Sequence, residues 1–433
     1  MVSELDKILI RWDRPEDAEG LETLHWEIRR KATFIDDASK RDKVRQICQK
    51  VYGGDEAVAA YTKEFDKVEL TPGQFRISEK DLEKSHEEID KTLLSSIRQA
   101  IKNVRQYQSE IFIGDKSTHP GIKYTPIKRV GVCVPGASAP LPSTVIMCVV
   151  PAQVAGVKEI VVVSPPRYKG SIHPVILATC CELGINEVYR IGGVQAVAAM
   201  AYGNGSIPKV DKIVGPGNQW VQTAKLELFG HVGIDSVAGP SEVLIIANDS
   251  AEPKYVAADM LSQAEHDPGI AVLFTDSERL ANKVLIELKK QVSKLERYAQ
   301  TEKCLIDFSR IVVFQNFDDA VKYANIFAAE HLQIQCGDKS REIAEKITNA
   351  GAIFIGDYTP VAVGDYWAGP SHSLPTGMTA KFFSPLSAND FIKSTSIIEY
   401  DRKKLAESAE DIIRLAEAEG LDAHARSIKI RMQ

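Results

Sequence analysis

The stretch Arg129-Val130-Gly131-Val132-Cys133-Val134-Pro135-Gly136 marks the point where the sequence begins to alternate between apolar strands and helices. Its β-branched residues and closing glycine predict a strand that ends in a tight turn. A helix is predicted behind it over 143–155, and the run Ile160-Val161-Val162-Val163 predicts a buried strand closed by Ser164-Pro165-Pro166. Strand, turn and helix in this order form the unit from which parallel sheets are built.

The same unit recurs twice along the following chain. The first recurrence has a strand over 187–191, the turn Gly192-Gly193 and a helix over 195–202. The second has a strand over 212–214, the turn Gly215-Pro216-Gly217-Asn218 and a helix that ends near Leu228. Because strands that alternate with helices line up in one direction, this region is predicted to be α/β, with a doubly wound, Rossmann-like parallel sheet.

A second alternating block begins near residue 239. Strands are predicted at 242–247, 270–275, 310–314, 332–335 and 352–355, and helices at 253–264, 277–292, 318–329 and 340–348. This pattern predicts a second doubly wound, Rossmann-like sheet. Two such blocks suggest a cleft between them, with ligands at the carboxyl ends of the strands.

Helical sequence flanks the two blocks. Apolar residues recur at helical spacing from Glu16 to Phe65, with a break at Gly53-Gly54, and again from 78 to 108. The tail has a predicted helix over 403–418, a stop at Gly420 and a short strand-like segment over 428–430. We therefore predict four parts, which are an N-terminal segment (1–24), a first α/β domain with most catalytic residues (25–130 plus 239–385), an inserted nucleotide-binding-like domain (131–238) and a C-terminal arm (386–433).

Composition excludes several classes of protein. The chain has 433 residues, of which 44% are hydrophobic and 26% charged, and its net charge of -6 comes without any basic tract interleaved with aromatic residues. We therefore expect no nucleic-acid partner. The apolar stretches are too short and too interrupted to span a bilayer, so no membrane association is expected. Seven cysteines without CxxC spacing predict reduced thiols in a cytoplasmic protein.

Four segments place a histidine near a carboxylate or an amide, at 263–266, 330–331, 365–372 and 419–424. Nitrogen and oxygen donors without sulfur favour an open catalytic zinc-type site over a closed structural one. Gln263 and His266 are three residues apart near a helix end, so both can reach one cation. Alternatively, His266 is a helix-end histidine that contacts only backbone.

Glu330 and His331 lie where a helix passes into a strand. A carboxylate beside an imidazole supplies two bases, which suits a reaction with two proton transfers. The alternative is a surface ion pair. The loop 364–375 follows a strand and contains Asp365, a possible metal ligand, and His372, a possible substrate or proton contact, although a purely structural loop is equally compatible.

The glycine turns at 192–193 and 215–218 precede helices, an arrangement that lets backbone amides approach a phosphate. The GxGxxG pattern is absent, so tight turns needed only for packing remain an alternative. Gly239-Pro240-Ser241-Glu242 opens the second block, and Ser241 either binds a substrate or caps a turn.

In this order the segments resemble the histidinol dehydrogenase family, from about residue 25 to His424. The resemblance rests on these motifs: Gly-Pro-Gly-Asn (215–218), Gly-Pro-Ser-Glu (239–242), Ser-Gln-Ala-Glu-His (262–266), Ala-Glu-His-Leu (329–332), Gly-Asp-Tyr (364–366), His-x-Leu-Pro-Thr (372–376) and Ala-His (423–424). It implies a homodimer with one Zn²⁺ per subunit and NAD as the oxidant.

The resemblance also assigns roles to individual residues. The implied zinc ligands are Gln263, His266, Asp365 and His424, and the acid–base pair is Glu330 and His331. L-Histidinol would be bound by the zinc ligands and by Ser241, His331, His372 and Glu419, with Glu419 and His424 reaching across from the partner subunit. NAD would contact Gln195, Asn218 and position 133, where Cys133 replaces the family's common tyrosine.

The implied reaction is the four-electron oxidation of L-histidinol to L-histidine through L-histidinaldehyde, the last step of histidine biosynthesis. His331 would take the hydroxyl proton, and Glu330 would activate water for the second oxidation. Alternatives are a related zinc- and NAD-dependent dehydrogenase for another small polar alcohol, such as a sulfonated diol, a zinc hydrolase, and a binding protein with a structural metal.

Overall fold

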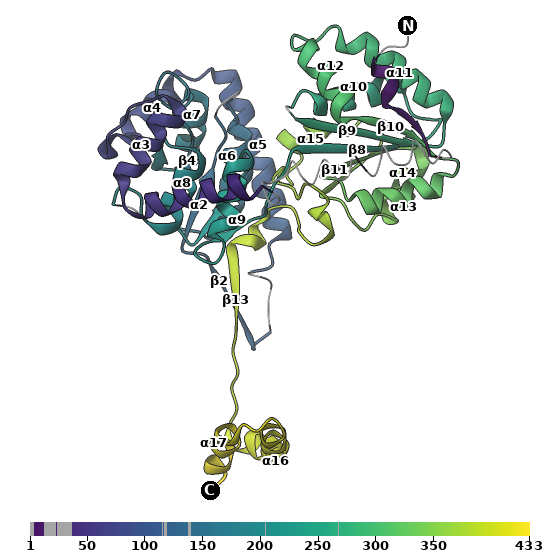
Figure 1. The fold of residues 1–433 in the computed structure, drawn as a ribbon. Coiled ribbons are helices and arrows are strands. Elements are labelled where there is room, and N and C mark those ends of the chain that lie inside the picture. The colour runs from purple at the N-terminus through teal and green to yellow at the C-terminus, as the bar shows by residue number, and fades with distance from the viewer. Residues whose placement is uncertain are drawn as a thin grey trace. The chain divides into compact units, whose positions relative to one another are not determined.

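The computed structural model describes residues 4–12, 23, 37–114, 116, 119–136, 140–203, 205–266 and 268–433. The chain divides into two compact units, Met1–Phe112 with Pro126–Phe391, and Ile113–Thr125 with Ile392–Gln433 (Figure 1). Of the helical segment predicted from residue 16 onward, the part before residue 37 lies outside the described residues, apart from Thr23. No described helix combines the length and the apolar character that a bilayer-spanning segment requires.

A five-stranded sheet forms in the first unit from the repeated strand–turn–helix pattern. Its strands run parallel in the order β5-β4-β3-β6-β7. They are β3 (Arg129–Cys133), β4 (Glu159–Val163), β5 (Glu187–Tyr189), β6 (Lys212–Val214) and β7 (Gly233–Ile234), and their helices are α6 (Pro142–Val154), α7 (Pro174–Glu182), α8 (Gly193–Tyr202) and α9 (Gln219–Leu228). The predicted parallel, doubly wound sheet is confirmed. The strand order reverses between β3 and β6, which is where such sheets form a ligand crevice.

Four helices that precede this sheet in the chain pack against the helices that cover it. They are α2 (Ala38–Tyr52), α3 (Asp55–Asp66), α4 (Glu79–Glu88) and α5 (Lys91–Ile111). The break at Gly53-Gly54 falls between α2 and α3, where Gly54 has φ of +129°. Helix α2 contacts α8 and α9, and its Val44 and Ile47 are buried in the same core as Ile213 of β6. The predicted domain boundaries, which group 25–130 with 239–385, stay a prediction.

The first unit also contains a six-stranded sheet. Its strands are also parallel, in the order β1-β10-β9-β8-β11-β12. They are β1 (Leu9–Arg11), β8 (Ser241–Ala247), β9 (Gly269–Thr275), β10 (Arg310–Val313), β11 (His331–Gln335) and β12 (Ala352–Ile355). Val243 and Ile245 of β8 point into one apolar core, and Leu244 and Ile246 into the other. This alternation shows that both faces are covered, as parallel sheets require.

Most of the helices that flank the six-stranded sheet are those predicted. They are α10 (Pro253–Ala264), α11 (Glu278–Val292), α12 (Tyr298–Phe308), α13 (Phe317–Phe327), α14 (Ser340–Glu345) and α15 (Val361–Tyr366). Short 3₁₀ helices are η1 (Glu4–Ile8), η2 (Pro72–Gln74), η3 (Gly337–Lys339), η4 (Thr379–Lys381) and η5 (Ala388–Phe391). The sequence pattern does not predict α12 or α15, and α15 changes the setting of Asp365, which lies on a helix instead of in the predicted loop.

The second unit contains a small sheet of β2 (Ile122–Pro126) and β13 (Ile392–Ser396), followed by α16 (Arg402–Ala418) and α17 (Asp422–Met432). The predicted stop at Gly420 is confirmed, because this residue has φ of +72° between the two helices. The predicted strand at 428–430 is wrong, since these residues belong to α17. Small side chains, such as Ala416 and Ala425, are buried between the two helices.

Candidate active site

The candidate catalytic residues gather at the amino ends of two neighbouring strands. Strands β8 and β11 run side by side, with His331 opposite Val243. Ser241 is the first residue of β8, and Glu330 directly precedes β11. The sequence pattern predicts ligands at the carboxyl ends of the strands, whereas these side chains lie at the opposite edge. The polar residues lie at or just before the first residue of each apolar strand. Because β8 and β11 are neighbours in the sheet, these residues lie close together at its amino edge.

The Glu330 carboxylate is fixed by hydrogen bonds from β8. Its Oε2 accepts one from the Ser241 hydroxyl and one from the Glu242 backbone N–H, both at 2.8 Å. Its backbone is tightly packed, because a Cβ at Gly351 would lie 2.5 Å from the Glu330 carbonyl oxygen. Glu330 is 6% exposed, so its carboxylate has little water around it. A carboxylate held in this way keeps one orientation toward the site.

Glu242 is a second acid, completely buried behind Glu330. Its Oε1 accepts hydrogen bonds from the backbone N–H groups of Glu330 and Gly377, both at 3.1 Å. Its Oε2 is buried and has no hydrogen-bond partner among the described residues. Burial, and next the negative charge of Glu330, raise the pKa of Glu242 to about 8. At neutral pH Glu242 is therefore a neutral carboxylic acid that joins the Glu330 backbone to the 371–377 loop.

His331 is held with one ring nitrogen engaged and the other facing Asp365. Its Nδ1 lies 3.1 Å from the Glu242 carbonyl oxygen and 3.4 Å from Glu330 Oε2. Because oxygens at these positions can only accept, Nδ1 carries a proton. Its Nε2 is buried, lies 3.5 Å from Asp365 Oδ1 and has no hydrogen-bond partner within the described part of the chain. Nε2 is thus the nitrogen that can exchange a proton with a substrate.

Two opposing effects set the pKa of His331. Burial lowers it, but the charge of Glu330 and the close carboxylates of Asp365 (3.5 Å) and Glu330 (3.4 Å) raise it to about 10. His331 is 3% exposed, so water screens these charges weakly. The imidazole therefore holds its proton strongly while both carboxylates are ionised.

Asp365 links three histidines electrostatically. Burial raises the pKa of its carboxyl, but the close contact with His331 and its charge, and then the charges of His372 and His266, hold the pKa below its usual value. Burial lowers the pKa of His372, against the attraction of Asp365. Asp365 therefore lies 3.5 Å from His331 and within the range over which the charges of His372 and His266 act on it.

The remaining predicted metal ligand in this unit is Gln263, near the end of α10. It is 2% exposed, and its Nε2 has no hydrogen-bond partner among the residues described. An unpaired buried donor is costly, so the Gln263 nitrogen fits an additional hydrogen-bond acceptor. No three His, Cys, Asp or Glu side chains in the described ranges gather closely enough to hold a metal. An amide oxygen with Asp365 and His266 nevertheless supplies the donor types that zinc accepts.

Glu419 and His424 belong to the second compact unit. Glu419 caps the end of α16, and His424 lies in the first turn of α17. Both side chains are exposed. Apolar side chains of this helix pair are exposed as well, including Leu415 at 66% and Ile430 at 65%. Exposed apolar surface of this kind suits a helix pair that packs against another protein surface.

The predicted NAD contacts lie in the five-stranded sheet and its helices. Cys133 ends β3 and Gly215 follows β6, on either side of the point where the strand order reverses. Burial raises the pKa of the Cys133 thiol to about 12, so it stays neutral. Asn218 Oδ1 accepts hydrogen bonds from the Trp220 and Val221 backbone N–H groups and caps α9. The turn therefore presents an ordered helix start at the crevice.

Gln195, in helix α8 beside this sheet, lacks hydrogen bonds from the described residues at both of its side-chain polar atoms. The side chain is completely buried. Gly193 has φ of +68°, and a Cβ there would lie 2.8 Å from Gln195 Oε1. A glycine is therefore needed for the turn and for the amide behind it.

Sequence reasoning missed the role of Glu242 and the residues that hold the 215–218 turn. The signal for Glu242 was a carboxylate at the start of the apolar strand Ser241–Ala247, where a buried acid requires partners. Lys225 of α9 and Asp235 gave no such signal, because their contact depends on where β7 lies in the sheet.

Comparisons with known proteins agree on one family. The family model described as histidinol dehydrogenase matches residues 29–432. A histidinol dehydrogenase of Rhodopirellula baltica is 49% identical over 397 residues, which cover 90% of this chain and 86% of that protein. One of Oceanobacillus iheyensis is 46% identical, covering 91% and 93%. The crystal structure of histidinol dehydrogenase from Elizabethkingia anophelis is 35% identical, with a TM-score of 0.83 over 90% of this chain and 92% of that one.

Proposed function

The chain belongs to the histidinol dehydrogenase family, and we propose that it oxidises L-histidinol to L-histidine through L-histidinaldehyde as the last step of histidine biosynthesis. The observation that carries the proposal is the cluster of Ser241, Glu330, His331 and Asp365. It holds two bases side by side, and a reaction with two successive oxidations needs both.

His331 acts on the alcohol in this proposal. Its Nε2 accepts the hydroxyl proton while Nδ1 remains fixed on the Glu242 carbonyl oxygen. Because Asp365 raises the pKa of His331, Asp365 bound to a cation would attract the imidazolium less. The pKa of His331 would then fall toward that of a base able to act near neutral pH.

Glu330 acts on the aldehyde. Its carboxylate accepts a proton from water, and the resulting hydroxide equivalent adds to the aldehyde carbon to give the hydrate. Ser241 donates to Oε2, which keeps that oxygen oriented and leaves Oε1 for water. Oxidation of the hydrate then yields the carboxylate of L-histidine.

Gln263, His266, Asp365 and His424 would hold the zinc ion, which would orient the substrate and lower the pKa of the hydroxyl it binds. His372 and Glu419 would contact the substrate's amine and imidazole. Support comes from the donor types that Gln263, His266 and Asp365 supply, and from the charges of His331, His372 and His266 that act on Asp365.

NAD would accept two electrons as hydride in each oxidation, so two molecules are consumed for each L-histidinol. Gln195, Asn218 and Cys133 would lie along its binding site. The buried, unpaired amide of Gln195 and the position of Asn218 at the start of α9 support this placement. The seven free cysteines suit the reducing cytoplasm, where we place the enzyme.

We further propose a homodimer in which Glu419 and His424 complete the partner's site. Their exposure, beside exposed apolar residues of α16 and α17, supports an arm that docks on another subunit. Mixing inactive His266→Asn and His424→Asn variants tests this proposal, because a heterodimer would regain one intact site. No recovery of activity after subunit exchange would contradict it.

Substrate comparison tests the chemistry itself. Purified enzyme with NAD should form NADH from L-histidinol and not from small polar alcohols without an imidazole, such as a sulfonated diol. Absence of NADH with L-histidinol, together with NADH from another alcohol, would move the chain to a different dehydrogenase activity. Hydrolysis without any use of NAD would favour a zinc hydrolase.

A further inference from the structure

Helix α9 and the segment after β7 share a buried ion pair outside the catalytic cluster. Lys225 and Asp235 form this pair, with side-chain exposures of 0% and 8%. Lys225 lies in α9, and Asp235 follows Ile234, the last residue of β7. Neither residue has a part in the proton transfers described above, so the pair needs another explanation.

The two charged groups hold opposite sides of one glycine. Lys225 Nζ donates a hydrogen bond to the Gly215 carbonyl oxygen at 3.1 Å, and the Gly215 N–H donates to Asp235 Oδ2 at 2.7 Å. Gly215 has φ of +104°, and a Cβ there would lie 2.4 Å from the Cys133 carbonyl oxygen. The first residue of the Gly-Pro-Gly-Asn turn is thus held by Lys225 and Asp235 through both of its backbone polar groups, close against the end of β3.

Gln222 makes a second link from the same face of α9. It is completely buried. Its Nε2 donates to the Gly217 carbonyl oxygen at 3.4 Å, and its Oε1 accepts from the Ala238 N–H at 3.0 Å. The 215–217 turn is therefore tied through one side chain to the segment that leads into Ser241.

That segment continues into the catalytic cluster. The Gly239 N–H donates to the Thr376 hydroxyl, and Thr376 lies in the same loop as His372. Two residues later, Ser241 donates to Glu330. Hydrogen bonds and short backbone segments together thus connect the turn proposed for NAD with side chains proposed for L-histidinol.

Stability alone does not explain the ion pair. Removing two charges from water carries a large desolvation cost, and well-packed apolar pairs of similar volume are often as stable or more stable. An apolar pair could not bond to the N–H and C=O of Gly215. What Lys225 and Asp235 supply beyond packing is a defined position for this turn.

We propose that Lys225, Asp235 and Gln222 are positioning residues that hold the Gly215–Asn218 turn and the Ala238–Ser241 segment in fixed register, so that NAD and substrate are aligned. This inference rests on the proposed function. Small errors in alignment reduce rates strongly, because reacting atoms must lie within about 3–3.5 Å of each other.

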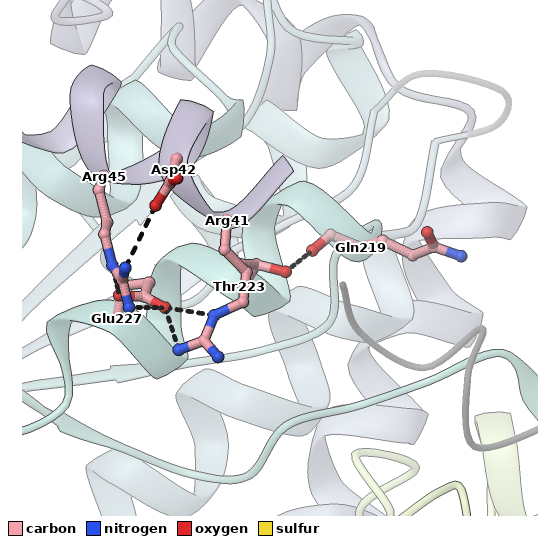
Figure 2. A network of polar contacts seen from close by, with 6 residues as sticks. All are labelled: Arg41, Asp42, Arg45, Gln219, Thr223 and Glu227. Atoms are coloured by element: carbon pink, nitrogen blue, oxygen red, sulfur yellow. Dashed lines mark hydrogen bonds and ion pairs between the residues drawn. The ribbon is translucent and has the colours of Figure 1, made fainter. Parts of the chain in front are cut away.

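Glu227 offers a matched control in the same helix. It accepts hydrogen bonds from Arg41 Nε (2.9 Å) and Arg45 Nε (2.6 Å) of α2, as Figure 2 shows. In the same view Asp42 pairs with Arg45. This network fastens α9 to α2 instead of to the turn. Glu227→Gln therefore loosens the helix without removing the links to Gly215 and Gly217.

The test compares this control with the double variant Lys225→Met/Asp235→Leu and with Gln222→Leu. Thermal unfolding checks the fold, calorimetric titration gives the Kd for NAD, and steady-state kinetics give kcat and both KM values. We expect the double variant to remain folded while its Kd for NAD rises about tenfold, equivalent to about 1.4 kcal/mol, and its kcat falls. Gln222→Leu should shift both quantities in the same direction, and Glu227→Gln should change only the melting temperature.

Several outcomes would overturn the proposal. A folded double variant with wild-type Kd and kcat would show that the pair is only structural. If the double variant does not fold, Gln222→Leu becomes the test of the proposal. Wild-type Kd and kcat in that variant would refute a role of these residues in aligning NAD and substrate. An equal rise of the Kd in Glu227→Gln would show that general loosening of α9 is the cause. Failure of the wild-type enzyme to bind NAD or oxidise L-histidinol would instead refute the proposed function.

Discussion

Replacing Glu242 by glutamine should make the protein less sensitive to alkaline pH. Glu242 is completely buried, and its pKa rises from 4.5 to about 8, first through burial and then through the charge of Glu330. Because the pKa is raised in the folded state, the stabilisation from the neutral acid is full below pH 4.5. It is lost as the pH rises from 4.5 to about 8, since the unfolded chain ionises first.

The size of this effect follows from the same values. Each pH unit corresponds to about 1.4 kcal/mol, so the 3.5 units between 4.5 and 8 give at most about 5 kcal/mol. Glutamine is neutral at every pH, and its Oε1 can still accept from the Glu330 and Gly377 N–H groups. The melting temperature of Glu242→Gln relative to the wild type should therefore rise steadily from pH 5 to pH 8, by several degrees, and level off above.

The assay is thermal unfolding of both proteins at half-unit steps from pH 5 to pH 9. Asp259→Asn is a suitable control, because Asp259 is a buried acid whose pKa burial raises to about 6 although Gln333 and Gln335 donate to it. Its relative melting temperature should rise only up to about pH 6. Parallel profiles of Glu242→Gln and wild type from pH 5 to 8 would refute the conclusion that Glu242 is neutral.

Three further substitutions test the site. His331→Asn should retain zinc in metal analysis and lower kcat for L-histidinol by about 10²- to 10⁴-fold, whereas Asp365→Ala should lose zinc; equal zinc loss in both would contradict the assigned roles. Glu330→Gln should lower NADH formation from L-histidinaldehyde by about 10²-fold or more because water is no longer activated, and an unchanged rate would exclude Glu330 as the base. Gly351→Ala would bring a Cβ to 2.5 Å from the Glu330 carbonyl oxygen, so it should lower both the melting temperature and kcat, and wild-type values of both would show that this contact is easily relaxed.

The elements were predictable wherever local sequence determines them. Strands such as β4 and β9 are apolar runs bounded by glycine, proline or serine, so both sheets could be predicted as parallel. Strand β1 was missed because three residues carry no periodicity, and its place is set by pairing with β10. The segment 428–430 alternates apolar and charged residues like a strand, but it lies inside the longer helix α17.

The sequence predicted which residues form the site but not which of them contact one another. Glu330 and His331 stood out as adjacent bases, but the contact between Ser241 and Glu330 joins residues 89 positions apart. It exists because β8 and β11 are neighbours, and strand order is a property of the whole sheet. For the same reason the sequence did not reveal that Asp235 meets Lys225 at Gly215. The zinc set, the NAD contacts and the exchange of Glu419 and His424 between subunits stay predictions.

The most direct test of the central claim is the amount of NADH formed per L-histidinol consumed, before and after zinc removal by a chelator. Two bases in one site and a four-electron oxidation predict two NADH for each L-histidinol, loss of activity without zinc and its recovery when zinc is restored. A ratio of one, with aldehyde as the final product, would contradict the role of Glu330. Full activity without metal would contradict the zinc site.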